Sequence, residues 1–346
     1  MALVLVFVVP KINIGSEDDL KYIYGTFIGQ KSPYNGIIEI WNIDTFESGL
    51  KSKSSYLDAM AKKFQKRNKG LYVVLRNLTI GECQNLLKSG EIPDVISCSY
   101  GVSDSIKDYV SAYEDVCENV FDNFLEAGRG ADGKLYALAW CTGFYSLIST
   151  KSKLEKAGKI TNDVNLNEIA FESSYEFKVG KKNKLSRSLV FGSGDYLMPK
   201  NALKAYNKAR SIQIEETENK ELNLKSQYSA YTSFLSNDAT ILLGTHRDVF
   251  KMQAREESGK IQDVVYLPLT NWTDLVQFSF LCKGDNNERN EMAEKFAIFL
   301  TETRNQEKLE DIGMFPVTKV ENTSLKGVMR DIILENFSDY ELEKVI

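Results

Sequence analysis

The stretch "GIIEIWNIDTFESGLKSKSSYLDAMAKKFQKRNKGLYVVL" (residues 36–75) decides the fold. Its first apolar run, at residues 36–41, predicts a strand, and apolar side chains recur at helical spacing over residues 54–67. The apolar run at residues 71–75 predicts a second strand. Because a strand, a helix and a strand follow at short spacing, the stretch predicts a right-handed crossover between two parallel strands.

The same alternation continues along the chain. The helix expected over residues 79–90 opens with a capping box, Thr79 to Glu82, and ends at Gly90. A third strand is expected at residues 93–98. The repeated pattern predicts an α/β fold whose mainly parallel sheet is flanked by helices.

Polar side chains follow each of the three expected strands. Ligands of open α/β sheets bind beyond the carboxyl ends of the strands, so we expect these side chains to line a crevice. They are Asn42, Asp44 and Thr45 after the first strand, Asn77 and Thr79 after the second, and Ser99, Tyr100 and Ser103 after the third. Thr79 is already explained as a helix cap. For the loop at residues 42–50, a solvated connection beside a buried Trp41 is the alternative interpretation.

Length and charge limit the class of protein. A chain of 346 residues exceeds the size at which a single core stops growing, so we expect two domains. The chain has 43 Lys and Arg residues and 48 Asp and Glu residues, well mixed, for a net charge of -5. This balance argues against nucleic acid or anionic lipid as the main partner.

The cysteines show no regular framework. Cys83, Cys98, Cys117, Cys141 and Cys282 contain no C-x-x-C spacing, so they indicate neither a zinc ribbon nor a disulfide scaffold. We expect them to be buried small hydrophobic residues. Their odd number argues against secretion.

The N-terminus carries a short apolar run after Met1, which Pro10 closes. The run is too short to span a bilayer. We expect residues 1–35 to be the remnant of a signal or anchor segment and a polar spacer; a first strand is the alternative.

The later part of the chain has fewer clear patterns. We expect helical structure at residues 103–125, helices at 199–210 and 290–304, and strands at 263–269 and 275–284. A formal G-x-G-x-x-G match at Gly128, Gly130 and Gly133 follows a helix and precedes a strand, the reverse of a dinucleotide-binding site. It predicts a hairpin turn instead.

Most catalytic groups are missing from the sequence. There is one histidine, His246, and no H-E-x-x-H, G-x-S-x-G, phosphate-loop or metal-spaced Cys/His motif, so we expect no metal and no cofactor. A nucleophilic Cys98 or Cys141 paired with His246 is one enzymatic alternative. A carboxylate pair for glycoside cleavage is another that the sequence leaves open.

Three stretches resemble a known family. They are "IIEIWNIDTFESG" (37–49) with the helix and strand to residue 75 and "GEIPDVISCSYG" (90–101); "DGKLYALAWCTGFYSLISTKSKLEKAG" (132–158); and "AYTSFLSNDATILLGTHRDVFKM" (230–252) with "VVYLPL" (264–269) and "AEKFAIFLTETRNQEKLEDIGMFPV" (293–317). Together they resemble the extracellular solute-binding proteins of ABC importers, in the branch of maltose and other oligosaccharide binders. The resemblance covers about residues 36–320 and is more specific for the fold than for the ligand.

The resemblance implies a type II periplasmic-binding-protein fold, in which two α/β lobes close by hinge motion on a ligand cleft. Lobe one would hold residues 36–135 and 264–310, and lobe two residues 136–263 and 311–346. The loops after the first and third strands, the crossover and the "GTHRD" turn (244–248) would face the cleft. The ligand-binding residues that we expect there are Trp41, Asp44, Thr45, Ser99, Tyr100, Trp140, Thr142, Tyr145, His246, Arg247 and Trp272.

Some of these residues have a competing structural interpretation. Tryptophans suit a sugar site because an aromatic face packs on the C–H face of the ring, but Trp41 and Trp140 are equally suited to a core. Trp272 is expected to be exposed or to line the cleft. His246 and Arg247 have an alternative role in charge pairing with Asp248.

The expected function is therefore that of an extracytoplasmic solute-binding protein, a monomer. It is expected to capture a small solute, a carbohydrate, and to deliver it to the permease subunits of an ABC importer. Contact with the membrane would occur only through an N-terminal anchor. The alternative is a cytosolic α/β enzyme, such as a cysteine hydrolase that uses Cys98 or Cys141 with His246.

Overall fold

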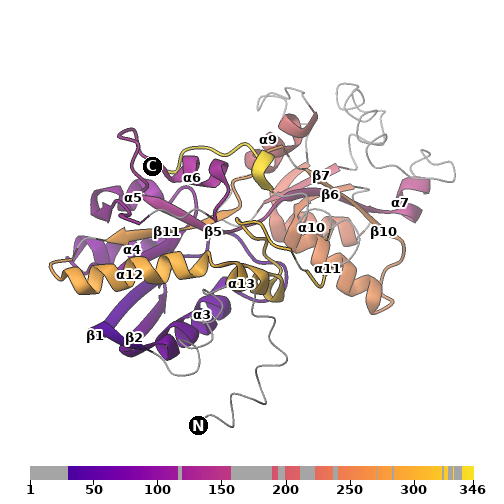
Figure 1. The fold of residues 1–346 in the computed structure, drawn as a ribbon. Helices are drawn as coiled ribbons and strands as arrows, with labels where there is room; N and C mark the ends of the chain where they lie inside the picture. The colour runs from indigo at the N-terminus through magenta and orange to yellow at the C-terminus, as the bar shows by residue number, and fades with distance from the viewer. Residues whose placement is uncertain are drawn as a thin grey trace, which may run out of the picture.

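The protein was analysed as a computed structural model, which describes residues 30–115, 119–156, 189–193, 199–210, 223–236, 241–269, 271–282, 284–321, 323–325, 330 and 337–346. The described strands form two sheets rather than one continuous sheet (Figure 1). Sheet one has the order β2-β1-β3-β11-β4, with β5 also paired to β11, and sheet two has the order β10-β6-β9-β7-β8. We call each sheet with the helices packed on it lobe one and lobe two.

Sheet one contains the βαβ units that the sequence predicts. Its strands are β1 (Gln30–Asn42), β2 (Asn68–Asn77), β3 (Val95–Cys98), β4 (Val110–Ser111), β5 (Ala137–Thr142) and β11 (Val276–Cys282). β1 pairs in parallel with both β2 and β3, whereas β11 runs antiparallel to β3, β4 and β5.

The helices of lobe one include α3 (Lys53–Arg67), α4 (Ile80–Lys88) and α12 (Asn287–Leu300). The predicted apolar face of α3 is buried, and Phe64 on this face packs edge-on against Phe296 of α12 with ring centroids 5.4 Å apart. The capping box at the start of α4 is also confirmed, because Glu82 N donates to Thr79 Oγ1 while Thr79 N donates to Glu82 Oε2.

Sheet two comprises β6 (Tyr145–Thr150), β7 (Leu189–Ser193), β8 (Asn223–Ser226), β9 (Ile241–Thr245) and β10 (Val264–Leu269). β10, β6 and β9 are antiparallel neighbours, and β9, β7 and β8 are parallel ones. Its larger helices are α9 (Pro199–Arg210), α10 (Gln227–Leu235) and α11 (His246–Glu257).

The remaining described helical segments are short. They are α5 (Ser103–Ile106), η2 (Lys107–Tyr109), α6 (Asp122–Gly128), α7 (Lys151–Lys156), α13 (Thr303–Gln306), η4 (Glu307–Ile312) and η5 (Phe337–Asp339). None of the described helices is both long and apolar enough to cross a membrane.

The chain passes directly between the two sheets. β5 leads into β6 through Gly143 and Phe144, so that two consecutive strands belong to different sheets. Gly143 is required here because a Cβ atom on it would lie 2.2 Å from Cε1 of His246. The connection from β10 to β11 returns the chain to sheet one.

Several local predictions were wrong. β1 begins at Gln30 rather than Gly36, because a register shift lets Gln30 and Lys31 pair with Asn68 and Lys69. The expected helical stretch at residues 103–125 is broken into α5, η2, β4 and the start of α6. Both sheets are mixed rather than mainly parallel, because strands near each connection run against their neighbours.

The predicted hairpin turn is confirmed. Arg129 and Leu135 form an antiparallel bridge, and Gly133, whose φ is 79°, donates its N–H to Gly130 O at 3.0 Å. Residues 1–29 and Cys117 lie outside the described residues. The proposed lobe boundaries stay a prediction.

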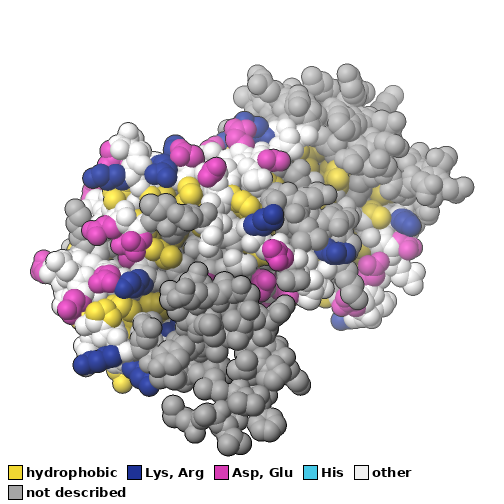
Figure 2. Space-filling view, in the orientation of Figure 1, with side chains coloured by type: hydrophobic (Ala, Val, Ile, Leu, Met, Phe, Trp, Pro, Cys, Tyr) yellow, Lys and Arg dark blue, Asp and Glu magenta, His cyan; other side chains and the backbone are white. Residues whose placement is uncertain are grey.

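Charged side chains of both signs are interspersed over the face of the molecule in Figure 2, as the mixed sequence suggests. Beneath the surface, one cluster of buried apolar side chains includes residues of both sheets, such as Phe278 of β11 and Leu243 of β9. The lobes therefore share packed apolar contacts near their connections.

Candidate functional site

Two groups of polar side chains lie where the lobes meet. We call them the Asp274 cluster, which comprises Ser99, Tyr100, Tyr145, Asn201, Lys204, Trp272 and Asp274, and the Lys53 cluster, which comprises Asp44, Phe46, Glu47, Lys53, His246 and Arg247. Each contains residues that follow strands of sheet one and residues that belong to sheet two or its helices.

Asp274 is the centre of the first cluster. Tyr145 Oη donates to Asp274 Oδ1 at 2.8 Å, and Asn201 Nδ2 donates to Asp274 Oδ2 at 2.7 Å. Ser99 Oγ donates to the backbone carbonyl of Asp274 at 3.3 Å. Tyr145 and Asn201 belong to lobe two, whereas Ser99 follows β3 of lobe one, so Asp274 bonds to residues of both lobes through its carboxylate and its backbone carbonyl.

Burial raises the pKa of Asp274 to about 6, although the bonds from Tyr145 and Asn201 favour its charged form. Such a shift shows that burial disfavours the carboxylate more than its partners stabilise it. Buried carboxylates of this kind are found disproportionately at functional sites.

Aromatic rings flank the carboxylate. Trp272 stacks on Tyr145 with ring centroids 6.2 Å apart, and Lys204 Nζ lies 4.7 Å from the centroid of the Trp272 ring. Trp272 is buried, so it is not an exposed side chain, and the other expectation, that it lines the cleft, stays a prediction. Its Nε1 has no hydrogen-bond partner among the described residues.

The C-terminal residues 337–346 lie across the Asp274 cluster. Glu341 forms a parallel bridge with Trp272, and Tyr100 Oη donates to Glu343 O at 2.8 Å. On the other side, Lys204 of α9 pairs with the Glu343 carboxylate. The segment therefore covers the cluster from both lobes.

Lys53 is the centre of the second cluster. Only 1% of its side chain is exposed, and its Nζ donates to Phe46 O, lies 3.5 Å from Asp44 Oδ1 and lies 3.7 Å from the centroid of the Phe46 ring. Asp44 remains 41% exposed. Thr45, between Asp44 and Phe46, is buried, and its hydroxyl has no hydrogen-bond partner within the described chain.

Ion pairs join this loop to α11 of lobe two. Arg247 pairs with Glu47 of the loop and with Asp248, whose Oδ1 accepts from Arg247 Nη1 at 2.6 Å. The expected pairing of Arg247 with Asp248 is thus present, but it is buried rather than on the surface. Partial burial tends to raise the pKa of the exposed Glu47 carboxyl, but Arg247 and Lys251 outweigh it and lower the pKa.

His246 lies beside Arg247 at the start of α11 and is completely buried. Neither of its ring nitrogens has a hydrogen-bond partner among the described residues. Burial, with the nearby Lys53 and Arg247 cations, lowers the pKa of His246 to about 3, so the ring is neutral at physiological pH.

Trp41, Trp140 and Thr142 lie in the packed interior near these clusters. Trp41 Nε1 donates to Glu39 Oε1 at 2.8 Å. Trp140 stacks on Tyr56 with ring centroids 5.4 Å apart, and Thr142 forms backbone bonds with residue 315. A ligand can reach these side chains only if the packing around them changes.

The expected site residues are thus divided between three places: Ser99, Tyr100, Tyr145 and Trp272 in the Asp274 cluster; Asp44, His246 and Arg247, with Thr45 adjacent, in the Lys53 cluster; and Trp41, Trp140 and Thr142 in the interior. Most are buried, so the structure shows the lobes in contact. Their role in ligand binding stays a prediction.

The sequence analysis missed Asp274, Asn201 and Lys53. Asp274 directly follows "NWT" in a polar loop and Asn201 lies in the first turn of a helix, positions typical of solvated residues. Lys53 opens an amphipathic helix, where a lysine is usually exposed. A charged residue next to an expected strand end was the only sequence signal for Asp274.

The cysteine–histidine alternative lacks the necessary contact. Cys98 and Cys141 are buried, and burial raises the pKa of both thiols, which disfavours the reactive thiolate. Neither thiol bonds to His246 in the described part of the chain, since both ring nitrogens of His246 are without partners there. Within the described residues, no group of three or more His, Cys, Asp or Glu side chains could hold a metal ion.

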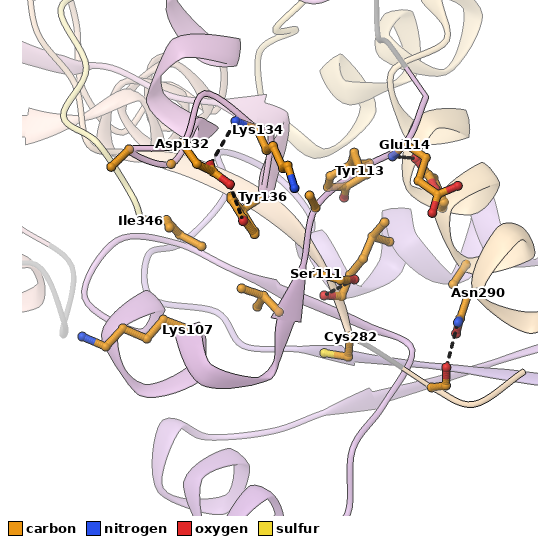
Figure 3. A pocket seen from close by; sticks show the side chains of 18 of the residues that line it. Lys107, Ser111, Tyr113, Glu114, Asp132, Lys134, Tyr136, Cys282, Asn290 and Ile346 are labelled. Atoms are coloured by element: carbon orange, nitrogen blue, oxygen red, sulfur yellow. Dashed lines mark hydrogen bonds between the residues drawn. The ribbon is translucent and has the colours of Figure 1, made fainter. Parts of the chain in front are cut away.

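A cavity of about 1090 Å³ lies elsewhere, at the outer edge of lobe one (Figure 3). It is bounded by β4, the hairpin at residues 130–136, the end of β11 and the start of α12, with Ile346 at its rim. Tyr136 Oη donates to Asp132 Oδ2 at 2.9 Å, and Glu294 accepts from Glu114 N at 2.6 Å (Figure 3). None of the expected site residues lines this cavity.

The chain matches no protein-family model, and no curated protein is similar to it in sequence. Solved structures do resemble it. UgpB from Mycobacterium tuberculosis, in complex with glycerophosphocholine, superposes with a TM-score of 0.59 at 16% identity over 83% of this chain and 83% of that chain. Iron-bound HitA from Pseudomonas aeruginosa gives a TM-score of 0.56 at 14% identity over 89% and 94% of the two chains.

Maltose-bound MalE3 from T. maritima has a TM-score of 0.56 at 14% identity and covers 82% of each chain. At such low identity these similarities concern the fold. The chain has the type II periplasmic-binding-protein fold, the two-lobed fold of the solute-binding proteins of ABC importers. The fold expected from the sequence is confirmed.

Proposed function

We propose that the protein is an extracytoplasmic solute-binding protein that captures a small solute between its lobes and delivers it to the permease of an ABC importer. The observation that carries the proposal is the meeting of polar side chains from both lobes, in the Asp274 and Lys53 clusters, at the carboxyl ends of β1 and β3. Ligands of open α/β sheets bind at such ends. Separation of the lobes would expose both clusters, and a solute would be held as they close again.

A carbohydrate is the solute class that we propose. Several buried groups at the contact are neutral hydrogen-bonding groups without partners among the described residues, including the hydroxyls of Thr45 and Ser48 and the indole N–H of Trp272. Sugar hydroxyls both donate and accept such bonds. Proteins of similar fold have been solved with maltose and maltotriose, although the iron-bound and glycerophosphocholine-bound relatives show that the fold also accommodates other ligands.

The expected cleft residues retain their proposed roles, to which we add Asn201, Lys53 and Asp274. Within this proposal Tyr145 and Asp274 exchange their mutual hydrogen bond for bonds to the solute, and Trp272 supplies an aromatic face. The protein acts as a monomer, reaches the membrane only through an N-terminal anchor, and does not transform its solute. Support for the last point comes from the buried Cys98 and Cys141 thiols, whose pKa burial raises.

Calorimetric titration of the pure protein tests the proposal. The panel of solutes contains oligosaccharides, glycerophosphodiesters and Fe³⁺. Saturable binding near micromolar Kd, roughly -8 kcal/mol, is the expected result. Tyr145→Phe should weaken binding, whereas Tyr228→Phe, at a position with 71% exposure on α10, is the matched control and should not. Chromatography of each mixture checks for new products, and steady turnover by pure protein would favour the enzyme alternative.

A further inference from the structure

His246 is the one histidine of the chain, and it lies where lobe two contacts lobe one. Its ring is surrounded by three phenylalanine rings: Phe46 of the loop after β1, at 6.5 Å between centroids, and Phe144 and Phe315, both at 5.9 Å. Phe144 and His246 flank sheet two, whereas Phe46 belongs to lobe one. Separation of the lobes therefore removes one wall of this enclosure.

Among the described residues, the carboxylates around His246 already face cations. From the loop after β1, Asp44 faces Lys53 at 3.5 Å, and Glu47 pairs with Arg247. Within α11, Asp248 is bound by Arg247 at 2.6 Å. The packed segments at residues 143–144 and 314–315 contain only Gly, Phe and Met.

The nearest charged groups that act on the ring are cations. Lys53 of α3 and Arg247 of α11 both disfavour protonation of His246, after the larger effect of burial. An imidazolium ion in this position would be desolvated and repelled by two cations, and these effects outweigh the favourable interaction with the Phe144 backbone.

We propose that the lobes close only when His246 is neutral, so that acidification opens the protein and releases its solute. The coupling depends on the hinge closure of the proposed function, but not on the identity of the solute. In this structure burial lowers the pKa of His246 to about 3, and removal of the Phe46 ring on opening moves the pKa back toward the ordinary value of 6.5.

The sign follows from proton linkage. Below pH 6.5 His246 binds a proton in the open form but stays neutral in the closed form. Each further decrease of one pH unit therefore favours the open form up to about tenfold, until the pH approaches 3. At pH 5 the effect of His246 alone on the open-to-closed ratio is at most about 30-fold. Asp274 acts in the opposite direction, because burial raises its pKa to about 6 and the closed form therefore favours its protonated state.

Because the chain has a single histidine, NMR of the unliganded protein reports its protonation without assignment by mutation. The imidazole chemical shifts are followed from pH 8 to pH 4. While the protein stays closed, they should not change with a midpoint near pH 6.5. Any protonation should coincide with an increase of the radius of gyration measured by small-angle scattering of the same samples. Titration near pH 6.5 with an unchanged radius would overturn the proposal.

Two variants separate the coupling from general acid sensitivity. His246→Gln removes the titrating group and should abolish the part of the acid-induced expansion that His246 causes; expansion identical to that of the parent protein would refute the coupling. Phe46→Ala opens the wall on the lobe-one side and should return the imidazole midpoint toward 6.5, whereas Leu50→Ala, in the same loop but exposed, should leave it unchanged. None of these measurements needs a solute, so they can fail or succeed independently of the binding screen.

Discussion

Replacement of Asp274 by asparagine should change the free energy of unfolding, relative to the wild-type protein, more favourably at high pH than at low pH. Asparagine has nearly the same shape and can still accept from Tyr145, but it carries no charge. The wild-type carboxyl has a pKa raised to about 6 by burial, against an ordinary value of 3.8. For an acid with a raised folded-state pKa, stability is present below 3.8 and is lost as the pH rises through the window up to about 6.

The magnitude follows from the size of this window. Above pH 6 the charged carboxylate destabilises the folded protein by about 3 kcal/mol relative to its protonated form, while at pH 4 most of that penalty is absent. The asparagine variant avoids the penalty at every pH but loses a charge-assisted bond from Asn201, worth about 1.5–3 kcal/mol. The change of unfolding free energy on mutation should therefore differ by about 2 kcal/mol between pH 4 and pH 8, in favour of the variant at pH 8.

Urea unfolding of both proteins at pH 4 and pH 8, with equal slopes as a check on two-state behaviour, measures this difference. Asp58→Asn on the exposed face of α3 is the matched control, because the same chemical change occurs there at a side chain that is 53% exposed. Its effect should be below about 0.5 kcal/mol at both pH values. Equal effects of Asp274→Asn at the two pH values would show that the carboxyl is not buried as the structure has it.

Three further changes test other parts of the structure. Trp140→Ala should lower the free energy of unfolding by about 3–5 kcal/mol, because the buried ring stacks on Tyr56. A loss below 1 kcal/mol in urea unfolding would contradict a core role and favour a role for Trp140 in the cleft. Asp44→Ala should weaken solute binding by about 1.5–3 kcal/mol in calorimetry, with little change of melting temperature, and unchanged affinity would remove the loop from the site. Thr79→Ala should lower stability by about 1 kcal/mol, since it removes one half of the capping box of α4, and thermal unfolding with no shift would contradict that role.

The parts of the fold that the sequence predicted are those governed by local periodicity. β1, α3, β2 and α4 follow each other in an unbroken alternation, so the parallel pairing of β1 with β2 and β3 could be inferred from residues 36–98 alone. The antiparallel pairing of β11 could not, because its partners β3, β4 and β5 are distant in sequence. Long-range pairing leaves no periodic signal within a single segment.

The candidate site was less predictable for a related reason. Apolar and aromatic residues at strand ends suit a core and a ligand wall equally well, and only the packed environment shows that Trp41 and Trp140 are enclosed. Asp274 gains its importance from Tyr145 and Asn201, which lie far from it in the sequence. A lysine at a helix start, such as Lys53, is buried here because Phe46 and Asp44 fold over it.

Asp274 and His246 give the contact between the lobes two ionisable groups with opposite pH responses. Acidification from pH 6.5 toward 3 favours the open form through His246, whereas acidification from about pH 6 to 3.8 favours the closed form through protonation of Asp274. If α9 leaves Asp274 when the lobes separate, as its bond from Asn201 requires, both responses act on the same opening motion. The two responses largely offset each other between pH 3.8 and about 6. Asp274→Asn should therefore make acid-induced opening steeper, because only the histidine remains, and His246→Gln should make acid favour the closed form, because only the carboxyl remains.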